Sequence, residues 1–197
     1  MLATIAAALL TGGASSRMGR DKAHLELGGV PSATRISRLL ADLFEDVLIV
    51  GGDPPASARG RRVADTEGPQ CALRGIVAAL AAATHERVVV VATDLPLVTP
   101  DLLLALVAWP DADAVVPRSA SGPHPLCALY RREPVLAVAH ARLEDGQLAL
   151  RGLLDAVGSV YLDESDLEKV DPDGNALLNV NTPEDLARAQ SAARASD

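Results

Sequence analysis

Residues 4–22 read TIAAALLTGGASSRMGRDK, an apolar run followed at once by a glycine-rich segment with three basic side chains. The apolar part, Thr4–Leu10, predicts a buried strand at the start of the fold. Similar short runs follow along the chain with amphipathic segments between them, an alternation typical of βαβ units. These runs predict strands near Val47–Val50, Val88–Ala92 and Ala114–Val116, and weaker strands near Cys127–Tyr130 and Val160–Leu162. We therefore expect an α/β fold with a largely parallel sheet.

Helix and loop signals lie between the predicted strands. Apolar residues at positions i, i+3, i+4, i+7 and i+8 predict a helix with one buried face; they are Ile36, Leu39, Leu40, Leu43 and Phe44. Thr99-Pro100 and Thr182-Pro183 each join a capping threonine to a proline and an acidic first turn, which predicts two helix starts. We expect the first of these helices to run to about Trp109. Asp53–Arg62 predicts an exposed loop and Ser119–Pro125 a second loop.

Length and composition limit the possible functions. A chain of 197 residues with 49% hydrophobic residues can close one core, so we expect a single domain over residues 1–197. The formal net charge of −8 and the aromatic content of 2% argue against a nucleic-acid partner, which needs a basic face or stacking rings. No stretch is long and apolar enough for a membrane span. Two cysteines, Cys71 and Cys127, without metal-ligand spacing favour reduced thiols and a cytoplasmic protein.

The segment Leu10–Lys22 is the strongest candidate for a binding site. It leaves the carboxyl end of the first predicted strand, where ligands bind in open α/β sheets. Its glycines allow backbone N–H groups to approach a phosphate, and Arg17, Arg20 and Lys22 concentrate positive charge in an acidic chain. The spacing matches neither a dinucleotide fingerprint nor a Walker A loop. A solvated strand-to-helix turn with ordinary surface cations is the alternative interpretation.

A second candidate is Asp94, in the tetrapeptide Thr93-Asp94-Leu95-Pro96 that follows the predicted strand Val88–Ala92. If that strand and the first one are parallel neighbours, Asp94 and the Leu10–Lys22 loop face the same crevice. A carboxylate that faces a triphosphate there suits Mg²⁺, for which it would be the single protein anchor. The alternative is a turn residue that accepts hydrogen bonds from nearby backbone donors.

Other polar residues give weaker signals. Asn179 and Asn181 precede the last predicted helix, and either could supply an amide oxygen to the same metal, although Asn beside a helix start is often structural. Asp65 could accept hydrogen bonds from the edge of a nucleotide base, or it could be exposed in a loop. No spacing of Ser, His, Cys or Asp singles out a covalent nucleophile.

These residues together resemble a known family. The loop Leu10-Thr11-Gly12-Gly13…Ser16-Arg17-Met18-Gly19…Asp21-Lys22 is similar to the signature loop of the nucleotidyltransferases that build molybdenum cofactor dinucleotides, and the chain resembles the molybdenum cofactor guanylyltransferases of the MobA type. The resemblance continues through Thr93-Asp94-Leu95-Pro96, His124-Pro125-Leu126 and Asn179-Val180-Asn181-Thr182-Pro183-Glu184-Asp185. Asp21-Lys22 favours the guanylyl branch, because the related cytidylyl enzymes typically have Pro-Lys there.

The resemblance implies a Rossmann-like three-layer sandwich and a site for GTP. The nucleotide-binding residues that it implies or favours are Leu10, Thr11, Gly12, Gly13, Gly19, Lys22, Asp65 and Asp94. Arg17, Lys22 and Asp94 would be the catalytic residues, and Asp94 with Asn181 would hold Mg²⁺. The expected reaction is attack by the terminal phosphate of molybdopterin on the α-phosphorus of GTP, with release of pyrophosphate. Proteins that deliver molybdopterin or accept the product are conceivable transient partners.

Two departures from the family pattern fall near the expected base site. The family usually has Gly-Pro-Leu-x-Gly near position 70, whereas Gln70-Cys71-Ala72 stands before Leu73-Arg74-Gly75 here. Gly51-Gly52 stands where an Asn often contacts the nucleotide in the family. A related transferase that uses CTP or a different phosphorylated acceptor is therefore an alternative, and so is a non-catalytic module that handles nucleotide or cofactor.

Overall fold

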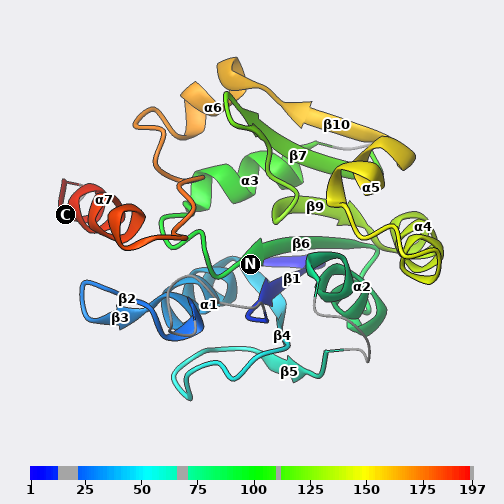
Figure 1. Cartoon of the computed structure of the whole chain (residues 1–197), viewed down its shortest axis with the longest axis horizontal. Coiled ribbons are helices and arrows are strands. Elements are labelled where there is room, and N and C mark those ends of the chain that lie inside the picture. The colour runs from blue at the N-terminus through cyan, green and yellow to red at the C-terminus, as the bar shows by residue number, and fades with distance from the viewer. Residues whose placement is uncertain (13–21, 66–70, 110–111, 196–197) are drawn as a thin grey trace.

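The computed structural model describes residues 1–12, 22–65, 71–109 and 112–195 of the chain. At its centre is an eight-stranded sheet in which the strands follow the order β10-β7-β9-β6-β1-β4-β5, while β8 pairs with β7 (Figure 1). The strands of this sheet are β1 (Leu2–Leu10), β4 (Phe44–Val50), β5 (Arg61–Val63), β6 (Arg87–Ala92), β7 (Ala114–Ser119), β8 (Gly122–Pro123), β9 (Cys127–Arg131) and β10 (Ser159–Leu162). A two-stranded hairpin of β2 (Glu26–Leu27) and β3 (Val30–Pro31) is separate from it.

Most neighbouring strands in the sheet are parallel. β1 pairs in parallel with both β4 and β6, β4 with β5, and β7 with β10. β9 is antiparallel to β6 and β7, and the short β8 is antiparallel to β7. The predicted fold class is confirmed, and each of the six predicted strands is present.

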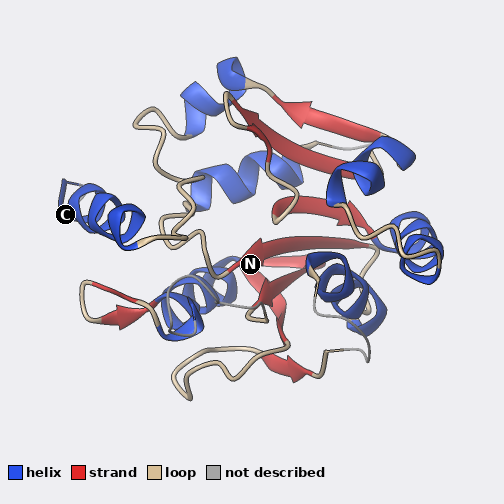
Figure 2. Ribbon diagram, in the orientation of Figure 1, coloured by secondary structure: helices blue, strands red, loops and turns tan. Residues whose placement is uncertain are grey.

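Helices cover both faces of the sheet and complete three layers (Figure 2). α1 (Ser32–Leu43), α3 (Pro100–Ala108) and α6 (Glu164–Val170) pack on one face, and α2 (Ala72–Ala82), α4 (Arg132–Glu144) and α5 (Leu150–Ala156) pack on the other. Successive residues of β1 alternate between the two cores, so that Leu9 joins the first and Leu10 the second. A strand buried on both faces needs apolar residues throughout, which explains the uninterrupted run in the sequence.

The last helix, α7 (Pro183–Ala195), fastens the small hairpin to the molecule. One small apolar cluster contains Leu27 of β2, Ala189 of α7, and Val180 of the segment that precedes α7. This cluster ties the segment after the glycine-rich loop to the segment that carries Asn181, although more than 150 residues separate them in the sequence.

Two predicted helix starts agree with the structure. α3 begins at Pro100, with the Thr99 hydroxyl accepting a hydrogen bond from the Leu102 amide at 3.3 Å. α7 begins at Pro183, where the Asp185 amide donates to the Thr182 hydroxyl at 3.1 Å. The cap residue and the proline at the first helical position therefore act as their sequence pattern predicts.

Three predicted boundaries are wrong. Phe44 starts β4 and does not continue α1, because its pairing opposite Leu2 of β1 buries the ring in the sheet. Arg61 and Arg62, placed in a loop by the sequence, form the edge strand β5 beside β4. Residues 119–125 are not a simple loop either, since β8 pairs back on the end of β7. In each case tertiary strand pairing decides the conformation, which local sequence signals do not contain.

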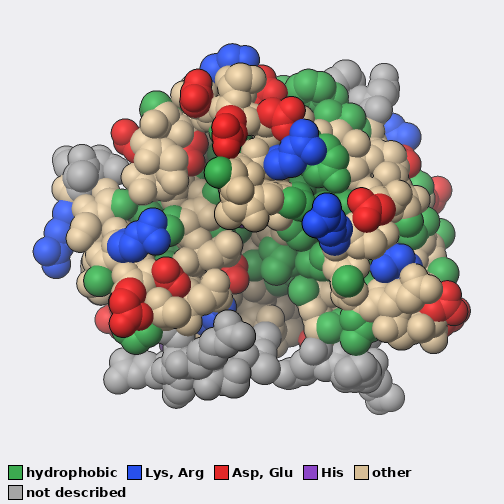
Figure 3. Space-filling model, turned by 45° about the horizontal axis from the view of Figure 1, so that its top comes forward, with side chains coloured by type: hydrophobic (Ala, Val, Ile, Leu, Met, Phe, Trp, Pro, Cys, Tyr) green, Lys and Arg blue, Asp and Glu red, His purple; other side chains and the backbone are tan. Residues whose placement is uncertain are grey.

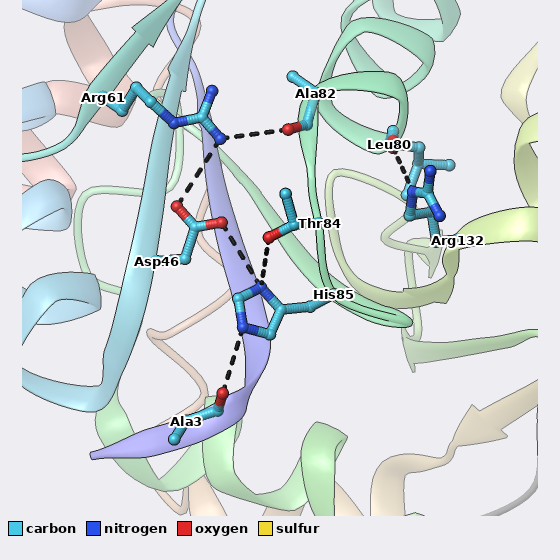
Figure 4. Close-up of polar contacts among 8 residues, drawn as sticks. All are labelled: Ala3, Asp46, Arg61, Leu80, Ala82, Thr84, His85 and Arg132. Atoms are coloured by element: carbon cyan, nitrogen blue, oxygen red, sulfur yellow. Dashed lines mark hydrogen bonds and ion pairs between the residues drawn. The ribbon is translucent and has the colours of Figure 1, made fainter.

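Polar contacts fasten the amino-terminal edge of the sheet (Figure 4). The Arg61 guanidinium donates to the carbonyl oxygen of Ala82 at 3.1 Å and lies 3.8 Å from Asp46 Oδ1. His85 Nδ1 is 3.5 Å from Asp46 Oδ2, and His85 Nε2 is 3.2 Å from the Ala3 carbonyl oxygen. These contacts tie the carboxyl end of α2 to β1, β4 and β5, at the edge opposite to the loops that follow β1 and β6.

Charged side chains are mixed over the surface. On the face drawn in Figure 3, Lys and Arg side chains are interspersed with Asp and Glu side chains. Of the described helices, none combines the length and the apolar character that crossing a membrane requires.

Candidate active site

The candidate site is at the carboxyl edge of the sheet, where β1 and β6 end side by side. Leu10 at the end of β1 pairs with Ala92 at the end of β6, and the Thr93 amide donates to the Leu10 carbonyl oxygen at 3.2 Å. From β1 the chain crosses to β4 on one side and later returns to β6 on the other. Such a switch point opens a crevice between the loops after the two strands, and ligands of open α/β sheets bind there.

Lys22, Asp94 and Asn181 converge at this edge from distant parts of the sequence. Lys22 belongs to a short 3₁₀ turn (Lys22–His24), and its Nζ lies 3.6 Å from Asp94 Oδ2. The same Nζ donates a hydrogen bond to Asn181 Oδ1. The Val180 amide donates to the Asp94 carbonyl oxygen at 2.8 Å, which fixes the Asn181 segment against the end of β6. The structure therefore brings together three of the described residues for which the sequence predicted phosphate or metal contacts.

The surroundings of the Asp94 carboxylate are unfavourable for its negative charge. Its side chain is 19% exposed, and Asp94 Oδ1 is buried without a hydrogen-bond partner among the described residues. Burial raises the pKa of the Asp94 carboxyl, while the neighbouring Lys22 ammonium acts in the opposite direction. A buried, unpartnered carboxylate oxygen costs free energy unless a cation or donor arrives.

The oxygens of Asp94 and Asn181 suit a hard divalent cation. Carboxylate and amide oxygens are the donors that Mg²⁺ accepts, and Mg²⁺ usually keeps several waters and few protein ligands. Both side chains already approach one cationic centre, the Lys22 ammonium. One carboxylate and one amide oxygen fit a hydrated ion that keeps most of its waters. The search of the described ranges found no group of three His, Cys, Asp or Glu that could hold a metal.

His124, which the sequence singled out only as part of a family motif, belongs to the surroundings of Asp94. Burial lowers the pKa of the His124 imidazole, and the negative charge of Asp94 opposes this shift. His124 Nε2 lies 2.8 Å from the Ser119 hydroxyl oxygen. Burial, with a further contribution from Asp94, raises the pKa of the Cys127 thiol to about 12, so this thiol is protonated at neutral pH. His124 lies between the short strand β8 and the buried strand β9, so the family motif is the signal in the sequence that points to it.

Asp65 lies on the other side of β1 from Asp94, just beyond β5. Both of its carboxylate oxygens accept hydrogen bonds from Arg74, with Nε to Oδ1 at 3.0 Å and Nη2 to Oδ2 at 2.8 Å. The sequence predicted a contact between Asp65 and a nucleotide base, and it gave no role to Arg74. The two residues are nine positions apart, on either side of residues 66–70, and no helix or strand periodicity signals the pair.

The backbone around Thr11 and Gly12 is closely packed. The Thr11 amide donates to the Val50 carbonyl oxygen at 3.0 Å, and the Thr11 hydroxyl donates to the same oxygen at 3.1 Å. Gly52 has φ +58°, and a Cβ there would lie 2.6 Å from the Thr11 carbonyl oxygen. The loop after β4 can therefore lie against the loop after β1 only with glycine at position 52. Leu10 is 6% exposed, so its side chain belongs to the core.

Several predicted site residues lie outside the described part of the chain. They are Gly13, Arg17 and Gly19 of the glycine-rich loop. Gly68, Pro69 and Gln70, at one of the departures from the family pattern, also lie outside it.

Comparisons with known proteins agree on one family. Residues 7–160 match the family described as the MobA-like NTP transferase domain. A Chloroflexus aggregans protein named probable molybdenum cofactor guanylyltransferase is 35% identical, with 92% of this chain and 91% of that protein covered. A Cereibacter sphaeroides protein named molybdenum cofactor guanylyltransferase is 37% identical, with 94% and 95% covered.

A solved structure shows the same fold. The crystal structure of molybdopterin-guanine dinucleotide biosynthesis protein A from Archaeoglobus fulgidus superposes with a TM-score of 0.83 at 25% identity, covering 96% of this chain and 99% of that one. The matched family model includes the carboxyl end of β1 and all of β6, whose ends form the candidate site. The chain belongs to the MobA-like NTP transferase family.

Proposed function

We propose that this protein transfers GMP from GTP to the terminal phosphate of molybdopterin, which releases pyrophosphate and forms molybdopterin guanine dinucleotide. The names of the relatives support this assignment. The observation that carries it is the convergence of Lys22, Asp94 and Asn181 at the switch point of the sheet. A cation beside an unpartnered carboxylate oxygen is an arrangement that a triphosphate and its metal ion complete.

The reaction needs charge neutralisation and alignment more than proton transfer. An oxygen of the acceptor phosphate attacks the α-phosphorus of GTP, the bond to the β-phosphate oxygen breaks, and pyrophosphate leaves with its electron pair. The attacking phosphate is anionic at neutral pH, so no general base is required. Catalysis of phosphoryl transfer rests largely on positioning and on stabilising charge in the transition state.

Each candidate residue has a role in this proposal. Lys22 would contact the phosphates. Asp94 and Asn181 would hold Mg²⁺, which would neutralise phosphate charge.

The remaining candidate residues surround the rest of the nucleotide. The backbone at Leu10, Thr11 and Gly12 borders the nucleotide, and Asp65 accepts hydrogen bonds from the base. From the glycine-rich loop, Arg17 adds positive charge, and Gly13 and Gly19 allow close approach of the backbone to phosphate. These last three assignments rest on the family motif alone.

A cavity of about 650 Å³ lies beside Asn181. Its lining combines neutral polar side chains and Arg188 with five carboxylates, which are Glu164, Glu168, Asp171, Asp173 and Asp185. We assign the acceptor to this cavity because Asn181 also contacts Lys22, so the cavity adjoins the expected reacting phosphates. The proposal includes a cytoplasmic location and transient contacts with proteins that supply or receive the cofactor.

The experiment incubates the purified protein with Mg²⁺, molybdopterin and each nucleoside triphosphate in turn. The dinucleotide is identified by mass spectrometry, and pyrophosphate release is measured in parallel. The proposal expects guanine dinucleotide and pyrophosphate in equal amounts, both lost in Asp94→Ala. Faster turnover with CTP would select the cytidylyl alternative, and GTP binding without pyrophosphate release would select a non-catalytic binding module.

A further inference from the structure

Asp65 forms an ion pair with Arg74 near the site, and the proposed function gives a role to Asp65 but none to Arg74. Arg74 lies in the first turn of α2, and its side chain is 7% exposed, whereas that of Asp65 is 27% exposed. Two hydrogen bonds of 3.0 and 2.8 Å join the guanidinium to the two carboxylate oxygens. Such a bidentate pair fixes the plane of a carboxylate as well as its position.

The pair is at the edge of the nucleotide crevice. A Cβ on Gly12 would lie 3.5 Å from Asp65 Oδ2, and a Cβ on Gly51 would lie 3.4 Å from the same oxygen. The Asp65 carboxylate therefore lies directly against the backbone that follows β1 and β4. Asp94 lies on the opposite side of the β1 end, after β6. A nucleotide with its phosphates at Asp94 would extend across Gly12 toward Asp65.

The Asp65 carboxylate can accept further hydrogen bonds in addition to those from Arg74. An ionised carboxylate only accepts hydrogen bonds and has about four lone-pair sites. Arg74 uses one on each oxygen, which leaves one on each oxygen for another donor. Guanine has two adjacent donors, N1–H and the 2-amino group, whereas the cytosine amino group is next to an acceptor nitrogen. The two lone pairs left over point away from each other, so the base reaches one Asp65 oxygen: opposite that oxygen guanine N1–H donates, whereas cytosine presents an acceptor nitrogen.

We propose that Arg74 is a positioning residue that holds the Asp65 carboxylate for the nucleotide base and so sets the preference for guanine over cytosine. The inference rests on the proposed function, because it takes the crevice to be the nucleotide site. The alternative role of the pair is structural: it would fasten the start of α2 to the segment after β5 without influence on the base.

The experiment compares kcat/KM for GTP and for CTP in the intact protein and in Arg74→Ala and Arg74→Lys. We expect the GTP to CTP ratio to fall about tenfold or more in Arg74→Ala, since losing one well-oriented hydrogen bond in a polar site has about this effect. Arg74→Lys makes a single point contact and cannot restore the bidentate geometry, so its ratio should be intermediate. The maximal rate with saturating GTP should change much less than the ratio.

Arg61→Ala is the matched control. Arg61 also contacts α2, through the Ala82 carbonyl oxygen, but at the amino-terminal edge of the sheet (Figure 4). If loosening α2 were enough to alter base preference, Arg61→Ala would alter it too. We expect the ratio to remain that of the unmodified protein.

A double-mutant cycle separates positioning from stability. If Arg74 acts through Asp65, Arg74→Ala in an Asp65→Ala background changes the ratio no further. A fall in melting temperature with an unchanged ratio in both Arg74 variants would overturn the inference. If the unmodified protein transfers nothing from GTP, the proposed function fails separately. Equilibrium dissociation constants for GTP and CTP with the same variants then decide the role of Arg74.

Discussion

Replacing Asp94 with asparagine should lower turnover about 10²-fold or more while making the protein more stable at neutral pH. The substitution removes one charge and keeps the shape of the side chain. The Asp94 carboxyl has a raised pKa because burial opposes its ionisation, and Oδ1 has no hydrogen-bond partner in the described chain. A neutral amide costs less to bury than a carboxylate in the same place.

Two opposing contributions determine how much Asp94→Asn raises the free energy of unfolding. The asparagine amide also leaves a polar atom unpartnered at this position, so the gain comes from removing the charge; a buried unsatisfied group costs about 1–3 kcal/mol, and more when it is charged. The ion pair with Lys22 returns part of this, at most about 1 kcal/mol, because its partners are 25% and 19% exposed and solvent screens them. We therefore expect Asp94→Asn to raise the free energy of unfolding by about 1 kcal/mol, which corresponds to about 2–4 °C in melting temperature for a chain of this size.

The direction of the pH dependence is fixed by the raised pKa. A carboxyl with a higher pKa in the folded state adds stability below its ordinary value of 3.8 and loses that contribution as the pH rises through the raised value. The asparagine variant does not titrate there. Its advantage over the unmodified protein should therefore be largest at neutral pH and shrink toward acidic pH.

Thermal unfolding in EDTA between pH 5 and 8 measures this difference, with Asp155→Asn, an exposed carboxylate on α5, as the control. Turnover in the same preparations should fall about 10²-fold or more, as when a group that stabilises transition-state charge is lost. Mg²⁺ with GTP should raise the melting temperature of the unmodified protein much more than that of the variant. An Asp94→Asn protein that melts below the unmodified one at every pH would refute the reasoning.

Two further substitutions test the site and its backbone. Lys22→Ala should lower kcat about 10²-fold, as expected when a donor to the reacting phosphate is removed; steady-state kinetics that show less than a tenfold loss would make Lys22 a structural cation. Gly52→Ala should lower the free energy of unfolding by about 1–3 kcal/mol, because φ is +58° and the new Cβ would lie 2.6 Å from the Thr11 carbonyl oxygen. Gly174→Ala has a similar φ of +67° with nothing within 4 Å of the new Cβ, so urea unfolding should show a smaller loss there.

Much of the fold follows from apolar periodicity. β1 and β6 are buried on both faces, and their continuous apolar runs predict central strands. Phe44 shows the limit of this reasoning, because its position fits the helical period of the preceding residues. The structure instead pairs it with Leu2, a contact that depends on the path of the whole chain. The edge strand β5 has half-exposed arginines in place of an apolar run, and so its sequence resembles a loop.

The site was predictable where topology determines it. Asp94 and Lys22 were expected together because residues after neighbouring parallel strands meet at one sheet edge, and their separation of 3.6 Å agrees with that expectation. Arg74 was not predictable in this way. Asp65 and Arg74 are nine positions apart in the sequence, and no strand or helix period relates them. Strand order therefore determines which loops meet, but it does not determine which side chains pair across them.

The same distinction explains why the charge state of the site could not be inferred from residue type. Asp94 and Asp65 are both aspartates after strands at one sheet edge. Asp65 shares both oxygens with a guanidinium, whereas Asp94 has one oxygen near an ammonium and one buried without a partner in the described residues. A carboxylate whose hydrogen bonds are met is suited to orient a ligand, and one left unsatisfied is suited to bind a cation. This difference in partners is the reason why we propose that the base binds at Asp65 and the phosphates at Asp94.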